Sequence, residues 1–253
     1  MSAYRSTASR EMRLRELKAR IASDASDHFP KCVIIGCGQP TPRAEKVGLG
    51  IALCRKHQRH RQRHGSPICA SPSAKLLKPY LRAANYLIRL KDTDPYVSAA
   101  RAGLLGLMAT AGPVEIATRL RGLLPAQRAR VALARLREAG VMPERLLAIA
   151  VAVHALIEDN PTATHRISDW TLVAIAKSAH RLSSGTHIKH ELRDDSGKLL
   201  SRTALHAYPR SSGRVLRHLG RAIENQCEWV IDRHLAEVVA LKNARETEQT
   251  GAP

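Results

Sequence analysis

The sequence is poor in aromatic and in acidic residues. Phe, Trp and Tyr make up only 3% of the 253 residues, which argues against a binding surface built from stacked rings. Asp and Glu number 22 against 41 Lys and Arg, so the formal net charge is +19. An excess of this size is unusual for an ordinary soluble enzyme and favours a polyanionic partner. The hydrophobic fraction of 44% is that of a globular chain, which excludes wholesale disorder.

Long hydrophobic runs are missing as well. The longest stretch without a charged residue, 102–114, has 13 residues and is broken by glycines and a proline. A membrane-spanning helix needs about 20 apolar residues. The N-terminal segment is rich in arginine and has no apolar run of the kind found in signal peptides. We therefore expect a soluble, cytoplasmic chain with no membrane partner, associated with the nucleoid if it binds DNA.

Cysteine occurs five times, and this odd count argues against a secreted disulfide framework. Four residues separate Cys32 from Cys37, and two separate Cys54 from His57. Zinc prefers four thiolate or imidazole ligands at the corners of a tetrahedron, commonly supplied as two short-range pairs. The spacing of the second pair places both ligands on one face of the first turn of a helix. The sequence therefore predicts a closed, structural Zn²⁺ site with these four ligands.

The same segment resembles the short zinc-binding knuckle of many phage and mobile-element proteins, which is similar to the treble-clef fingers found beside HNH nuclease cores. The matching residues are Cys32, Cys37, Gly38, Pro40, Leu53, Cys54, His57, Arg61 and Gly65. The resemblance covers about 35 of the 253 residues and implies a regulatory or accessory role. The insert at residues 43–51 is longer than in that family, and Cys69, just past the finger, is an alternative ligand.

A basic segment follows the second ligand pair. It carries five cationic residues and no carboxylate: Arg55, Lys56, Arg59, Arg61 and Arg63. Like charges four residues apart on a helix destabilise it by about 0.2–0.5 kcal/mol per pair. A polyanion lying along the helix would reverse the sign of this effect, because arginine binds phosphate well. This pattern predicts contact with nucleic acid, DNA in preference to RNA, although a solvated basic face is the alternative.

A metal-dependent nuclease would need carboxylates, or a His/Asp pair, to hold a hard cation beside the finger. Between Asp27 and Asp92 the only acidic residue is Glu45. No phosphate-binding P-loop, dinucleotide-binding glycine motif, zinc-protease motif or nucleophile elbow is present. We therefore expect a protein that is not an enzyme, with a metal-dependent nuclease as the less favoured alternative.

The rest of the chain is predicted to be mainly helical. Hydrophobic periodicity and prolines at starting positions predict helices near 74–91, 95–111, 113–122, 126–139, 143–158, 168–183 and 211–243. Two short runs around Gly197 predict a β-hairpin at 186–207. Trp170 and Trp229 are expected to anchor their helices in the core. The predicted parts are a basic N-terminal helix (1–30), a zinc finger (31–69), a helical bundle (74–183) and a hairpin with a long helix (184–253).

Residues 113–142 loosely resemble the helix-turn-helix of winged-helix regulators. In that reading the recognition helix presents Arg128, Arg130 and Arg135 to DNA. The alternative is an alanine- and leucine-rich bundle with solvated arginines. The main prediction is a zinc-stabilised, non-catalytic nucleic-acid-binding protein. The alternative, from another class, is an assembly protein whose helical body binds protein partners or pairs with a second copy of itself.

Overall fold

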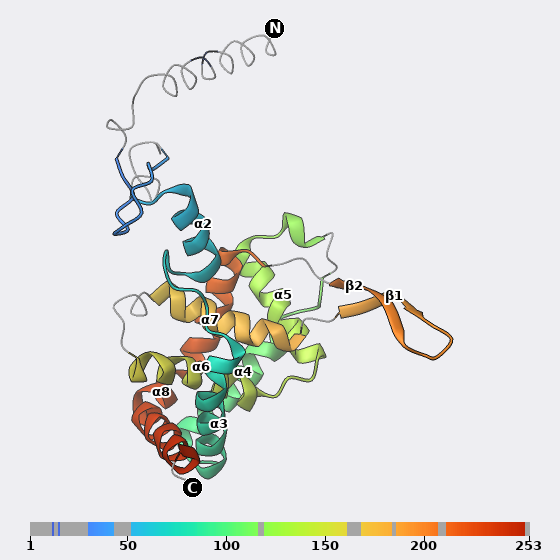
Figure 1. Cartoon of the computed structure of the whole chain (residues 1–253). Coiled ribbons are helices and arrows are strands. Elements are labelled where there is room, and N and C mark those ends of the chain that lie inside the picture. Colours follow the sequence, from blue (N-terminus) through green and yellow to red (C-terminus); the bar gives the residue numbers. More distant parts are fainter. Residues whose placement is uncertain are drawn as a thin grey trace. The chain divides into compact units, whose positions relative to one another are not determined.

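The computed structural model describes residues 12, 15, 30–42, 52–115, 119–160, 168–183, 186–206 and 211–250. The chain forms two compact units, Met1–Arg59 and His60–Pro253. The described residues contain seven α-helices and one two-stranded sheet, so the predicted mainly α class is confirmed (Figure 1). None of these helices is both long enough and apolar enough to cross a membrane. The helix expected within residues 1–30 lies outside the description, except that Met12 and Arg15 are helical.

The helices follow the predicted positions closely. They are α2 (Arg55–His64), α3 (Ala74–Leu90), α4 (Pro95–Ala109), α5 (Pro125–Glu138), α6 (Pro143–Asp159), α7 (Ser168–His180) and α8 (Gly213–Thr250). Proline occupies the first position of α4, α5 and α6, where the missing N–H would have no partner in any case. Asp94 caps α4, because its carboxylate accepts hydrogen bonds from the amides of Tyr96 and Val97 at 2.8 and 3.2 Å.

The helix predicted at 113–122 is wrong for the described part of that segment. Residues 112–115 are not helical, and only a short 3₁₀ turn, η2 (Arg119–Gly122), follows. The residue before a helix start normally has extended backbone angles. Gly112, which precedes Pro113, instead has a φ of 82°, and this angle does not fit a helix that starts at Pro113. The first helix of the suggested helix-turn-helix is therefore not seen in the described residues. Helix α6 follows α5, as the predicted helix at 143–158 required, whereas winged-helix regulators have a wing strand after the recognition helix.

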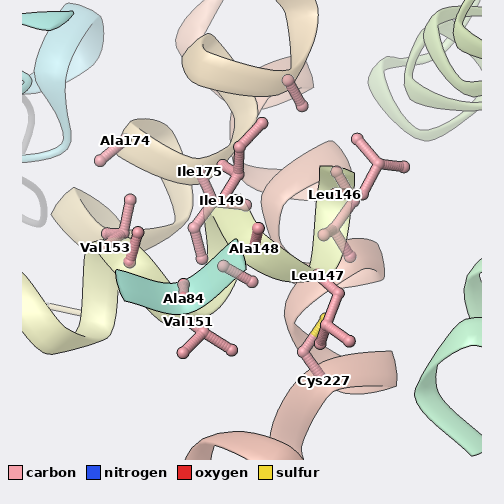
Figure 2. Close-up of a cluster of buried hydrophobic side chains, with 14 of the residues drawn as sticks. Ala84, Leu146, Leu147, Ala148, Ile149, Val151, Val153, Ala174, Ile175 and Cys227 are labelled. Carbon is pink, nitrogen blue, oxygen red and sulfur yellow. The ribbon is translucent and has the colours of Figure 1, made fainter. Parts of the chain in front are cut away.

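Helix α6 forms the centre of the second unit and packs against α3, α4, α7 and α8. Between Leu146 and Ile157 its one polar side chain is His154, which pairs with Glu224 of α8 at 2.9 Å. Figure 2 shows Leu147 and Ile149 of this helix among buried side chains from the neighbouring helices. Each large apolar side chain buried there contributes about 1.5–3 kcal/mol.

Polar contacts fix the ends of the shorter helices to α8. His234 of α8 is buried and meets Asp94 at the start of α4, with Nε2 3.2 Å from Oδ2. Burial alone would raise the pKa of Asp94, but hydrogen bonds from two backbone amides and from His234 outweigh it and hold the pKa below its usual value. About two turns further along α8, Lys242 donates to Asp159 of α6 at 2.8 Å, and Tyr80 of α3 donates to the same carboxylate oxygen at 2.6 Å.

The predicted β-hairpin is confirmed. Strands β1 (Thr186–Arg193) and β2 (Leu199–His206) pair antiparallel with two register irregularities (Figure 1). In the turn, Asp194 Oδ1 accepts hydrogen bonds from the amides of Ser196 and Lys198, and Gly197 has a φ of 83°, which glycine adopts without strain. Near the turn, Leu192 and Leu200 are exposed.

The two tryptophans differ in environment. Trp170 is buried as predicted, and its indole N–H donates to the Ala70 carbonyl at 3.0 Å. Trp229 is 69% exposed, so its prediction as a core anchor is wrong. On α8 the buried residues Cys227 and Val230 flank Trp229 in sequence, and the helical period therefore turns its side chain away from the core.

Gly220 of α8 allows a close backbone contact with α7. A Cβ at this position would collide with the Leu172 carbonyl, whereas a Cβ at Gly106 of α4 would meet no atom within 4 Å. We expect Gly220→Ala to reduce the free energy of unfolding by about 1–3 kcal/mol, because two helix backbones must separate. Gly106→Ala should be neutral or stabilise by about 0.5–1 kcal/mol. Urea denaturation of both variants checks this, and equal midpoints would contradict the close packing of α7 and α8.

Candidate metal centre

The structure brings together the four residues predicted as zinc ligands. One ligand atom from each of Cys32, Cys37, Cys54 and His57 lies within 4.8 Å of the others. The Cys37 and Cys54 sulfur atoms are 3.7 Å apart. Nδ1 of His57 is 3.4 Å from Sγ of Cys32 and 3.3 Å from Sγ of Cys54. A group of three thiols and one imidazole at these distances could hold a metal ion.

These spacings fit a tetrahedral ion. Zinc binds cysteine sulfur at about 2.3 Å and histidine nitrogen at about 2.0–2.1 Å, which places two sulfur ligands about 3.8 Å apart and a sulfur and a nitrogen about 3.6 Å apart. The observed distances of 3.7, 3.4 and 3.3 Å agree with this to within about 0.3 Å. No cysteine of the described residues forms a disulfide. The ligand atoms are therefore already arranged for coordination.

Backbone hydrogen bonds shape the first ligand pair into a tight loop. The amide of Cys37 donates to the Ile34 carbonyl at 3.0 Å, and the amide of Cys32 donates to Gln39 at 2.9 Å. Gly36 and Gly38 have φ values of 78° and 60°, which a residue with a Cβ rarely adopts. The loop therefore depends on glycine on both sides of Cys37, in agreement with the knuckle predicted from the sequence.

The second ligand pair lies at the start of α2. Cys54 immediately precedes this helix, and its carbonyl accepts a hydrogen bond from the Gln58 amide at 2.9 Å. His57 is in the first helical turn, so its ring reaches back to the Cys54 sulfur. The Gln58 side chain donates to the Leu53 carbonyl at 2.9 Å and fixes the chain as it enters the helix. The helix then ends at His64 before Gly65, whose φ is 79°, a common glycine position after a helix.

The surroundings stabilise thiolate at two of the three cysteines. At Cys54 the amide of His57 donates to the sulfur, and this outweighs burial and holds the pKa below its usual value. At Cys32 burial acts to raise the pKa of the thiol. Hydrogen bonds involving Cys54, Ile34 and His57 outweigh burial, so the pKa lies below its usual value. Cys37 shows the opposite direction: a backbone hydrogen bond at Gln39 lowers its pKa, but burial and the two neighbouring sulfurs raise it overall. Thiolates are the form that binds metals.

Within the described residues, this is the only cluster of three or more His, Cys, Asp or Glu side chains suited to a metal. Cys69, considered as an alternative ligand, is not a member. Cys227 is buried in the helical core, and burial raises the pKa of its thiol to about 12. It is therefore neutral and unsuited to metal binding.

The predicted nucleic-acid-binding residues differ in exposure. Arg55, Lys56, Arg59 and Arg63 are exposed on α2. Arg61 is partly buried, with its guanidinium 3.9 Å from the Asp169 carboxylate. On α5, Arg130 is exposed and Arg128 is partly buried, whereas Arg135 is only 5% exposed and donates to the Ser183 carbonyl at 3.1 Å. Arg135 therefore offers no surface to a macromolecule.

A second polar group was not singled out by sequence reasoning. His64, Ser71 and Lys177 meet in the second unit, with Lys177 Nζ 2.9 Å from Ser71 Oγ and 3.1 Å from His64 Nδ1. More than 100 residues separate Lys177 from the other two. No local pattern joins them, so only the tertiary fold could reveal the group.

No protein-family model, curated protein or solved structure matches this chain. The function is therefore argued from the metal-binding cluster and the charged surfaces of the chain itself.

The cluster predicts a specific dependence on Cys54. Cys54→Ser should reduce the zinc content of the purified protein from about one ion per chain to near zero, because serine is a poor zinc ligand. Elemental analysis by mass spectrometry measures this content. Cys69→Ser is the matched control and should retain the ion. Unchanged zinc content in Cys54→Ser would rule out the assignment.

Proposed function

We propose that this protein is a nucleic-acid-binding protein, with DNA as the preferred partner, whose N-terminal finger is stabilised by a structural Zn²⁺. The observation that carries the proposal is the direct continuation of the Cys54/His57 ligand pair into α2, a helix with no acidic residue and exposed cationic side chains. A metal bound by Cys54 and His57 would therefore hold the first turn of this basic helix in place.

A metal would add to the small apolar core of the finger. In the described residues 30–42 and 52–59, the buried apolar cluster consists of Cys32, Leu53 and Cys54, with Ile34, Cys37 and Ala52 partly buried around it. A core of this size does not offset the entropy of ordering the segment. Coordination free energy can supply the difference, as it does in small zinc domains. Three thiolates and one imidazole favour Zn²⁺ over hard cations, which prefer oxygen ligands.

The basic helix supports nucleic acid as the partner. Arg55, Arg59 and Arg63 recur every four residues, so consecutive guanidinium groups lie along one side of α2. Among the described residues none of these three has a carboxylate within ion-pair distance. Phosphates along a nucleic-acid backbone would neutralise such a row and release their counterions. The net charge of +19 agrees with this partner.

The proposed role is non-catalytic. Four protein ligands fill a tetrahedral zinc ion, so no position remains for a water or substrate. The finger segment 31–69 also contains a single carboxylate, Glu45, and one carboxylate is too few to hold a hard cation for phosphodiester cleavage.

A second candidate function is protein assembly, favoured by an exposed aromatic pair on the helical unit. Tyr96 of α4 and Trp229 of α8 stack with ring centroids 6.4 Å apart, and the Arg233 guanidinium lies 5.4 Å from the Tyr96 ring. Leu105 of α4 is also 58% exposed. Exposed aromatic and arginine side chains are enriched at protein interfaces. In this role the finger would only stabilise the N-terminal region.

Charge reversal on α2 tests the main proposal. The double variant Arg59→Glu/Arg63→Glu should bind a mixed-sequence DNA duplex at least about tenfold more weakly, and the slope of log affinity against log salt should fall by about two units. Fluorescence anisotropy of the zinc-loaded protein over a salt series, with duplex and single-stranded DNA and RNA probes, provides both numbers.

The matched control is Arg82→Glu/Arg89→Glu, which changes the same charge at two exposed positions of α3. It should lower affinity far less than the α2 variant. Equal losses in both variants would mean that net charge, and not α2, governs binding. Binding absent in the unmodified protein at low salt would refute the proposal and favour assembly, which a Trp229→Ala variant examined by sedimentation then tests.

A further inference from the structure

The polar group formed by His64, Ser71 and Lys177 lies entirely in the second unit. His64 is the last residue of α2, Ser71 is in the segment before α3, and Lys177 belongs to α7. The Ser71 amide donates to His64 Nδ1 at 3.0 Å, and Ser71 Oγ is 3.2 Å from the same nitrogen. Lys177 Nζ donates to Ser71 Oγ at 2.9 Å and lies 3.1 Å from His64 Nδ1. All three side chains are partly buried.

This group contains more donor hydrogens than acceptor lone pairs. A lysine ammonium brings three N–H donors, and a serine brings its amide and its hydroxyl. A neutral histidine nitrogen offers a single lone pair, and three donors converge on His64 Nδ1. The hydroxyl oxygen of Ser71 is the only other side-chain acceptor in the group. At least one N–H of Lys177 is therefore left to an acceptor from outside the group, and the O–H of Ser71 competes with the Ser71 amide for the one lone pair of His64 Nδ1.

The charge around Lys177 has one sign. Burial, together with the nearby guanidinium groups of Arg63 and Arg181, lowers the pKa of Lys177 to about 8. Burial, Lys177, His60 and Arg63 lower the pKa of His64 to about 4, so its ring is neutral at pH 7. Among the described residues no carboxylate lies within ion-pair distance of Lys177 or Arg63. Partly buried ammonium groups in proteins are ordinarily paired with an anion.

We infer that Lys177, Ser71 and the exposed Arg63 form a binding site for a phosphate group, with His64 positioning the serine and the lysine. A phosphate supplies several acceptor oxygens and the negative charge that the group lacks, and both lysine and arginine bind it readily. Arg63 provides the planar donor pair, and Ser71 donates its hydroxyl. The inference rests on the proposed function only for the source of the phosphate, which is a nucleic-acid backbone or a free phosphate.

Inorganic phosphate is the direct probe. The full-length, zinc-loaded protein should bind it saturably, as measured by ³¹P NMR line broadening at pH 7. Lys177→Gln should weaken this affinity at least about tenfold, because one charge-assisted contact and the local positive charge are both lost. Lys78→Gln, at an exposed position of α3, is the control and should leave the affinity unchanged.

If circular dichroism shows that Lys177→Gln is not folded, Ser71→Ala serves as the second variant. It retains the charge and removes one donor, so phosphate affinity should fall several-fold. Absence of phosphate binding in the unmodified protein, or equal affinity in Lys177→Gln and Lys78→Gln, would overturn the inference without affecting DNA binding through α2.

DNA binding by the same variants identifies the source. If the phosphate comes from a nucleic-acid backbone, Lys177→Gln should also reduce the salt slope of duplex binding by nearly one unit. If Lys177→Gln has a reduced affinity for inorganic phosphate but binds the duplex with unchanged affinity, the site is one for a free phosphate. Failure of the α2 double variant to alter DNA affinity would count against the proposed function alone, because phosphate binding is measured separately.

Discussion

Burial of α6 is the interaction on which the second unit depends. This helix is almost entirely apolar between Leu146 and Ile157, so it is stable only when other helices cover it on every side. Helices α3, α4, α7 and α8 do so, and α5 is added through its contact with α8. The surrounding helices can then present charged residues outward. Many of the positive charges of this basic unit, such as those of Arg82, Arg89 and Arg130, lie on exposed positions of the surrounding helices, whereas Arg135 is buried.

The N-terminal unit is stabilised in a different way. Its described residues bury almost no apolar surface beyond Cys32, Leu53 and Cys54, and two of these are themselves in the metal-binding cluster. The described residues of this unit are held by backbone hydrogen bonds, and their Cys/His cluster could add the ligands of a metal ion. Removal of a bound ion should disturb this unit while leaving the helical core intact, since Trp170, Ile149 and their neighbours belong to a separate cluster.

Local sequence signals predicted the elements that depend on local chemistry. Prolines predicted the starts of α4, α5 and α6. The spacing of the cysteines and His57 predicted the four metal-ligand candidates that the fold places together. The sequence contained the information needed to place Trp229 correctly. The apolar residues Cys227 and Val230 define the buried side of α8, and the helical period puts Trp229 on another side. Two other features had no such signal. The Ser183 carbonyl that holds Arg135 and the group around Lys177 depend on residues far apart in the sequence.

The contrast between the two tryptophans has a practical consequence. The chain contains only Trp170 and Trp229, one buried in the helical core and the other open to solvent beside Tyr96. Intrinsic fluorescence therefore combines a blue-shifted emission that follows the integrity of the core with a red-shifted emission accessible to soluble quenchers. Loss of quencher access without a shift of the buried component would signal that a macromolecule covers the Tyr96–Trp229 surface. Unfolding would instead expose the indole of Trp170 and shift the buried component to longer wavelength, while Trp229 stays accessible.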